Sequence, residues 1–220
     1  MNCQGTTLIM GMVFLFGLSL LALSGTSGML LQQQMASNFR DALASLKLAE
    51  NALLQASSWL MSLPGADRTP DCITECLLPA AIHPTNSFSR TAEFEGESWW
   101  SRHGVIAGIH PETREPFTEQ STPASSAYWL IEEISFEALL AHGGDYDIHG
   151  IGYYRILARG LHRLPGSRAV IETIVARPWG SGITPEEFPS IDGPLTFCRQ
   201  FDHSEFLSSK CGRLSWRQLQ

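Results

Sequence analysis

The chain has 220 residues, of which 44% are hydrophobic and 17% are charged, and its formal net charge is −7. This composition excludes a disordered chain and leaves room for one domain with a packed core beyond an N-terminal segment. The acidic balance argues against nucleic acid as a partner, because the sequence offers no basic stripe that could displace counterions.

The first predicted element is an apolar segment near the N-terminus. After the leader, residues 1–5, no charged side chain occurs before Arg40, and residues 8–31 supply the roughly 20 apolar residues that a membrane-spanning helix needs. A cleaved secretory signal is not favoured, because the leader has no Lys or Arg and no small-x-small site closes the segment. We therefore expect residues 6–31 to form a transmembrane helix.

The second predicted element is an amphipathic helix over residues 32–63. Apolar side chains recur there at steps of three and four residues, which places them on one helical face, and Pro64 and Gly65 mark its end. The alternative is a plain membrane anchor followed by an ordinary core helix. The positions expected on the packing face are Leu31, Met35, Phe39, Leu43, Leu46, Ala49, Leu53, Ala56 and Leu60.

The remainder, residues 64–220, is predicted to be a globular domain. Prolines make residues 64–95 read as a loop region, and Trp99 and Trp100 suggest a short helix or strand. Three segments have strand composition, 128–136, 153–159 and 169–177, and the last two form a hairpin. We expect these three strands to form an antiparallel sheet that covers the apolar face of the helix.

Four cysteines follow the apolar segment, and an even number beyond a membrane anchor suits disulfides in an oxidising compartment. Of the three possible connectivities, local pairing is favoured, Cys72 with Cys76 and Cys198 with Cys211. The rival for the first pair is a zinc half-site, but the sequence shows no second half-site with suitable spacing.

The sequence carries no recognisable catalytic constellation, and no enzyme activity, cofactor or metal is predicted. The seven histidines are dispersed, and neither a nucleophile-elbow motif nor a phosphate-binding loop is present. Asp145 and Asp147 lie in a glycine-rich turn that could hold Ca²⁺, but they lack the rest of an acidic ligand set.

Three motifs resemble one family. Residues 31–53 resemble the N-terminal helix of PilX-type minor pilins of the type IVa pilus, which are related to K-type minor pseudopilins. The family pattern Met-Ala-x-Asn followed by Ala-Glu-x-Ala-Leu falls here on Met35, Ala36, Asn38, Ala49, Glu50, Ala52 and Leu53. Residues 5–8 are similar to the family's prepilin junction, and residues 153–160 are similar to its Tyr-Arg-Ile-x-Ala-Arg-Gly strand.

The resemblance implies an α+β type IV pilin fold, in which a long N-terminal helix packs on a small antiparallel sheet. It implies that prepilin peptidase cuts after Gly5 and methylates Thr6. It also implies a C-terminal disulfide loop and, as helix packing motif, Met35, Asn38, Phe39, Leu43, Leu46, Glu50, Leu53 and Leu60.

The implied function is that of a minor pilin that primes assembly of the type IV pilus and serves twitching motility. Its partners would be other minor pilins, the major pilin and the inner-membrane assembly platform. The chain would cross the inner membrane once, with its C-terminal domain in the periplasm, and would then enter the pilus. The alternatives are a minor pseudopilin of a type II secretion system and a signal-anchored periplasmic binding protein or enzyme.

Two positions depart from the family pattern. The leader lacks the usual Lys or Arg, which weakens the orientation signal. Met10 stands where most pilins carry a glutamate that pairs with the N-terminal amine of a neighbouring subunit. Because an unpaired carboxylate in apolar surroundings is costly, Met10 predicts a place at or near the pilus tip, where no neighbour supplies that amine; simple tolerance of Met10 is the alternative.

Overall fold

The computed structural model describes residues 4–66, 78–79, 81–88, 92–117, 124–139, 148–161, 168–186, 188 and 193–219. The chain divides into two compact units, Met1–Asp41 and Ala42–Gln220. Helix α1, Gln4–Ser62, contributes residues to both units.

The first unit consists of the N-terminal part of α1. Its described apolar side chains are exposed, and Met10 is 78% exposed. Within the described residues, no helix combines the length and the apolar character that crossing a membrane requires. The predictions of a transmembrane segment and of a single-pass inner-membrane protein are therefore wrong.

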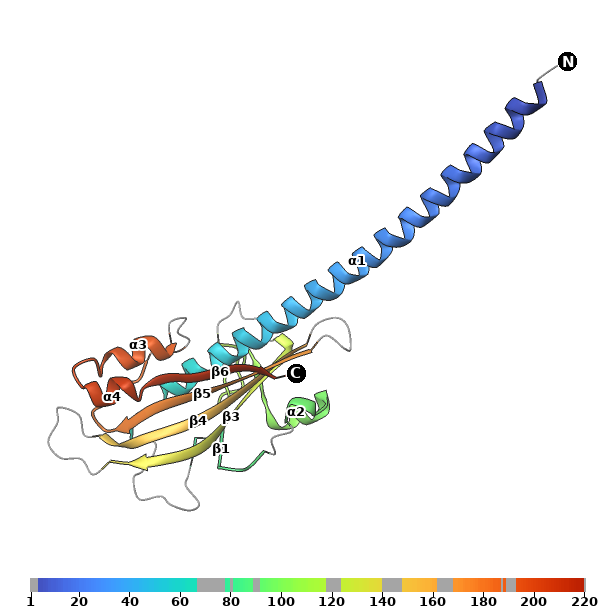
Figure 1. Ribbon diagram of the computed structural model, residues 1–220. Coiled ribbons are helices and arrows are strands. Elements are labelled where there is room, and N and C mark those ends of the chain that lie inside the picture. The colour runs from blue at the N-terminus through green and yellow to red at the C-terminus, as the bar shows by residue number, and fades with distance from the viewer. Residues whose placement is uncertain are drawn as a thin grey trace. The chain divides into compact units, whose positions relative to one another are not determined.

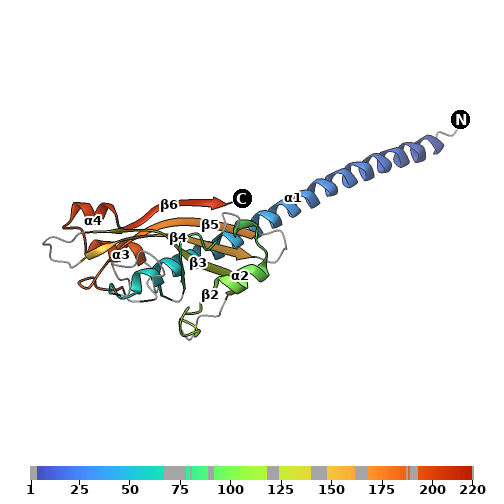
Figure 2. The same ribbon diagram turned by 90° about the horizontal axis from the view of Figure 1, so that it is seen from below.

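The second unit is built on a mixed sheet of six strands (Figures 1 and 2). The strands are β1 (Ile82–His83), β2 (Val105–Ala107), β3 (Ala124–Ala138), β4 (Ile148–Leu161), β5 (Arg168–Gly180) and β6 (Gly212–Leu219). Their order is β1-β3-β4-β5-β6, and β2 also pairs with β3. Only the β1–β3 pair is parallel among the described pairs.

In the described part of the chain, four short helical elements accompany this sheet. They are η1 (Ala92–Phe94), α2 (Glu97–His103), α3 (Gly193–Arg199) and α4 (Glu205–Ser209). Both views place α3 and α4 near one end of the sheet and α2 near the other (Figures 1 and 2). Ser204 caps α4, because its hydroxyl accepts a hydrogen bond from the backbone N–H of Leu207.

The predicted fold class, a long helix with a membrane half on a small antiparallel sheet, is wrong. The segments 128–136, 153–159 and 169–177 do lie within β3, β4 and β5, but the sheet has six strands and is mixed. Strands β1 and β2 span two and three residues, too few to show an alternating pattern. Strand β6 lies in the C-terminal region, where no strand was predicted.

Small residues bring the C-terminal part of α1 close to the sheet. Ala49, Ala52 and Ala56 are fully buried, and they belong to one core cluster with Trp59 and the inward-facing Trp129 of β3. The two tryptophan rings lie 5.7 Å apart. Because burial of a large apolar side chain is worth roughly 1.5–3 kcal/mol, this face supplies much of the stability of the second unit.

Helix and sheet approach closely at Gly160, near the end of β4. A Cβ atom there would lie 2.7 Å from the backbone nitrogen of Ala49 and closer still to the carbonyl oxygen of Ser45. Both obstacles are backbone atoms of α1, which cannot move aside as a flexible side chain would. Glycine at position 160 is therefore required by the distance between helix and strand.

The predicted packing face of the helix is buried only toward its C-terminal end. Leu53 and Leu60 are buried, whereas Leu46 is half-buried. The N-terminal members of the motif are exposed, as are its two polar members; these residues are Met35, Asn38, Phe39, Leu43 and Glu50.

We predict that Gly160→Ala will lower the free energy of unfolding by about 2–4 kcal/mol, because the added methyl group forces α1 and β4 apart. Gly96→Ala is the control, because a Cβ atom at position 96 meets no heavy atom within 4 Å. It should cost at most about 1 kcal/mol. Urea unfolding of the two variants measures the difference; equal values would show that the helix accommodates the methyl group.

Candidate functional site

The face of the sheet opposite α1, here called the outer face, has its own small apolar cluster. Side chains alternate along a strand, so Tyr128 and Leu130 point to the outer face while Trp129 points to α1. Trp100 of α2 packs on this face and donates a hydrogen bond from Nε1 to the carbonyl oxygen of Ala92 at 3.2 Å. The guanidinium of Arg159, which is also buried, lies 5.9 Å from the Trp100 ring centre.

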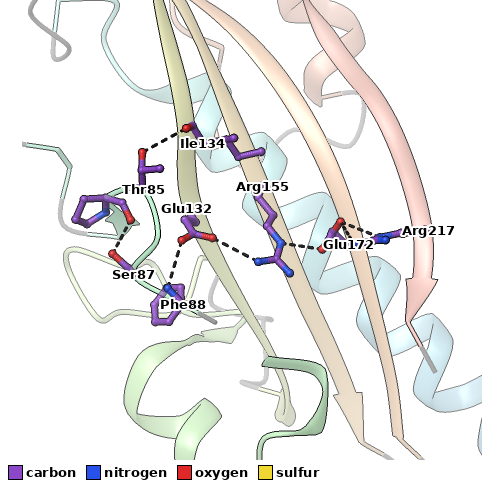
Figure 3. A network of polar contacts seen from close by, with 9 residues as sticks. Thr85, Ser87, Phe88, Glu132, Ile134, Arg155, Glu172 and Arg217 are labelled. Carbon is purple, nitrogen blue, oxygen red and sulfur yellow. Dashed lines mark hydrogen bonds and ion pairs between the residues drawn. The ribbon is translucent and has the colours of Figure 1, made fainter. Parts of the chain in front are cut away.

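Beside this cluster, four charged side chains from four neighbouring strands form a row, here called the charge ladder. Its members are Glu132 of β3, Arg155 of β4, Glu172 of β5 and Arg217 of β6 (Figure 3). Strand register produces the row, because Glu132 pairs directly with Arg155 and Glu172 pairs directly with Arg217. Charges alternate in sign along the ladder, which is the favourable arrangement for cross-strand neighbours.

The strongest contacts of the ladder converge on Glu172. Arg155 donates from Nε to Glu172 Oε2 at 2.7 Å, and Arg217 donates from Nε to Glu172 Oε1 at 2.9 Å. The contact of Arg155 Nη1 with Glu132 Oε2 is longer, at 3.5 Å. The side chain of Glu172 is 7% exposed and that of Arg217 is 65% exposed, so a buried carboxylate is held by one partly buried cation, Arg155, and one solvated cation.

A turn after β1 closes one side of the ladder. Asn86 has a φ of 63°, in the left-handed region that asparagine tolerates better than most residues, and Ser87 donates a backbone hydrogen bond to the carbonyl of Pro84 at 3.1 Å. The turn presents the backbone N–H of Phe88 to Glu132 Oε1 at 3.3 Å (Figure 3). Glu132 is therefore fixed from two directions.

Between this turn and the ladder lies a pocket of about 620 Å³, within the size range of pockets that hold small ligands. Its floor includes Glu132, Arg155 and Arg217, and Glu93 of η1 stands on its wall. The complete lining is Thr85, Asn86, Phe88, Glu93, Glu132, Glu133, Ile134, Arg155, Arg217 and Leu219. The pocket brings together residues that are far apart in the sequence, which is typical of a binding site.

An aromatic cluster supports the wall of the pocket. The ring of Phe88 makes edge contacts with His83, Trp99 and His103, at centroid distances of 4.5, 5.4 and 5.8 Å. Burial lowers the pKa of His83 below its ordinary value of 6.5. A hydrogen bond with the backbone of His103 and the charge of Glu132 both raise this pKa, and the charge of His103 lowers it, but burial is the largest of these effects. His83 therefore resists protonation in the folded protein.

The C-terminal end of α1 is held by a buried arginine. Arg177 of β5 donates a hydrogen bond from Nη2 to the carbonyl oxygen of Leu63, and its guanidinium lies 3.7 Å from the Trp179 ring centre. A cation suits the C-terminus of a helix, where unpaired carbonyl groups carry partial negative charge. Gly65 accepts a hydrogen bond from the backbone N–H of Gly180 at 3.0 Å, so the chain leaving α1 is fixed to the end of β5.

Cys198 and Cys211 form a disulfide, with Cα atoms 5.6 Å apart, which is consistent with the predicted pairing. Next to it, Lys210 Nζ contacts Glu137 Oε1 at 2.9 Å. The hydrogen bond from Lys210, followed by one from Tyr153, lowers the pKa of Glu137. The other predicted pair, Cys72 with Cys76, lies outside the described residues.

The structure places the remaining predicted residues as follows. Gly5 and Thr6 lie in the first turns of α1, and Met10 is exposed on the same helix. Asp145 and Asp147 lie outside the described residues. In the part of the chain that the structure describes, no group of three or more His, Cys, Asp or Glu side chains is placed to hold a metal ion.

Sequence reasoning missed the ladder and the pocket. Glu132 and Glu133 stand in the predicted strand 128–136, and the structure buries both; Tyr154 donates a hydrogen bond to Glu133 at 3.1 Å on the face that packs on α1. Arg155 and Glu172 lie inside strands that the sequence predicted. Their positions alone could have indicated charged side chains on one face of the sheet. Their register to Glu132 and Arg217 could not be derived, because β6 was not recognised.

No protein-family model, no curated protein and no solved structure matches this chain. The resemblance to PilX-type minor pilins thus stays a prediction from short motifs. The function is therefore inferred from the described residues.

We predict that Glu172→Gln will lower the free energy of unfolding by about 2–3 kcal/mol, because it leaves the partly buried Arg155 with only its longer contact to Glu132. Arg217→Gln removes the other side of the same ion pair but leaves no buried cation behind, so it should cost less than about 1 kcal/mol. Urea unfolding at neutral pH measures both values. Equal and small losses would show that the ladder contributes little to stability.

A second prediction concerns pH. Because the pKa of His83 is lowered on folding, its contribution to stability is complete above pH 6.5 and is lost as the pH falls through the folded-state pKa. His83→Phe keeps a ring beside Phe88 but does not titrate. As the pH falls from 7 to 5, the free energy of unfolding of the wild type should therefore decrease relative to that of the variant. A difference independent of pH would contradict this assignment.

Proposed function

We propose that the chain is a minor pilin that assembles with other pilin subunits through the N-terminal part of α1. The observation that carries the proposal is the exposure of apolar side chains along this part of the helix. The exposed large apolar side chains of the first unit are Leu8, Ile9, Met10, Met12, Val13, Phe14, Leu15, Phe16, Leu18, Leu20, Leu21, Met29, Leu30, Leu31, Met35 and Phe39.

An apolar surface of this kind is usually buried by binding to other molecules. Soluble monomers rarely expose a contiguous apolar patch of more than a few hundred Å². Each of these side chains gains roughly 1.5–3 kcal/mol when it is buried. Packing among the helices of neighbouring subunits would bury all sides of this part of α1, as a filament core does.

The glycines of this helix support close helix packing. A Cβ atom added at Gly11, Gly17 or Gly28 would meet no heavy atom within 4 Å, so no contact with the described residues requires glycine there. A glycine in the interior of a helix costs about 1 kcal/mol relative to alanine. Close approach of another helix backbone would explain why glycine occupies these three positions.

The resemblance to PilX-type minor pilins names the partner class. It implies other minor pilins and the major pilin as neighbours, and processing after Gly5 by prepilin peptidase with methylation of Thr6. Met10 supports a priming role at or near the filament tip, because an apolar side chain needs no partner amine from the next subunit.

We predict that Phe14→Asp will abolish co-purification of the full-length chain with pilin filaments, because a carboxylate among packed apolar helices is left unpaired. Gln33→Asp is the control, because it adds the same charge at an exposed polar position of the same helix. The measurement is the amount of chain that sediments with sheared filaments from the native cells.

Mass spectrometry of the sedimented chain checks maturation in the same samples. The expected N-terminus is methylated Thr6. Recovery of a chain that starts at Met1, or equal sedimentation of Phe14→Asp and wild type, would contradict the proposed function.

A further inference from the structure

The pocket on the outer face lies on a different part of the chain from the helix surface that carries the proposed function. Its residues come from the turn after β1, from η1 and from β3, β4 and β6. A ligand of this pocket is therefore recognised by the second unit alone, whether or not the chain assembles into a filament.

The charges of the pocket do not cancel. The two arginines of the ladder both donate to Glu172, and Arg155 also contacts Glu132, so two cations face two carboxylates. Glu93 is the additional carboxylate on the wall, and among the described residues it has no ion-pair partner. Glu133 also belongs to the lining, so the lining and the ladder together hold four carboxylates and two arginines, a surplus of two negative charges within a chain whose formal net charge is −7.

The remaining lining suits a long side chain with a cationic end. Phe88, Ile134 and Leu219 supply apolar surface for an aliphatic stem, and an aromatic ring also attracts a cation. Thr85 and Asn86 offer hydrogen-bonding groups at the rim. The volume of about 620 Å³ exceeds that of one side chain, so it can also admit the flanking backbone.

We propose that this pocket binds a lysine or arginine side chain of a partner polypeptide, with Glu93 as the carboxylate that receives the cationic group. An acidic ligand is disfavoured, because both arginines already donate to carboxylates of the ladder. Arg217, which is 65% exposed at the floor, repels the incoming cation and limits its affinity.

The test uses the full-length chain and four blocked tripeptides, acetyl-Gly-X-Gly-amide with X as Arg, Lys, Gln or Glu. Binding is followed by isothermal titration and by the NMR signals of the Phe88 backbone N–H and the Arg217 Nε–H. The Arg and Lys peptides should bind saturably and more tightly than the Gln peptide, and their affinity should fall with added salt.

Two variants give opposite expected effects. Glu93→Gln should weaken binding of the Arg peptide about fivefold, the size of one partly exposed charge contact. Arg217→Gln should strengthen it by up to about threefold, because a like charge is removed. The matched controls are Glu115→Gln and Arg213→Gln, which change the same charges at exposed positions outside the lining; both should leave binding unchanged.

Several outcomes would overturn the proposal. Tighter binding of the Glu peptide would show that the pocket recognises anions through Arg217. Equal binding of the Gln and Arg peptides, or no saturable binding of any peptide, would show that it is no cation site. Equal effects of Glu93→Gln and Glu115→Gln would place the interaction elsewhere on the acidic surface. None of these results would bear on sedimentation with filaments.

Discussion

The distance between α1 and β4 is the constraint on which the second unit depends. At Gly160 the strand has no side chain, and the helix presents Ser45 and Ala49, so the two backbones meet without an intervening layer. This contact fixes how deeply Trp59 and Leu60 enter the core. The buried hydrogen bond from Arg177 to Leu63 then fixes the other end of the same helical segment. Between these two points the helix and the sheet have little freedom to slide.

Packing against α1 stabilises the inner face of the sheet, so charged side chains can occupy the outer face. The ladder needs every strand from β3 to β6 in register, because a shift by one residue would turn each charged side chain to the apolar face. The core on the inner face enforces that register through Trp129, Tyr154 and Ile171. Packing on one side of the sheet thereby positions Glu132, Arg155, Glu172 and Arg217 on the other.

The sequence predicted the parts of this structure that depend on local pattern. Three long strands and the helix end at Ser62 follow from alternation and from the Pro64–Gly65 stop signal. The membrane and fold-class predictions were wrong, and β6 was missed although Leu214 and Trp216 alternate with Arg213, Ser215 and Arg217. The pocket could not be predicted, because it depends on the order and register of strands as distant in sequence as those of Glu132 and Arg217. The sequence of a single strand does not specify the strand beside it.

The position of β6 in the chain has a consequence for how the pocket comes into being. The floor is completed by Arg217 and Leu219, which belong to the final strand, whereas its wall residue Glu93 is made more than a hundred residues earlier. During synthesis, the residues of the wall and of most of the floor are therefore made before the strand that completes the pocket.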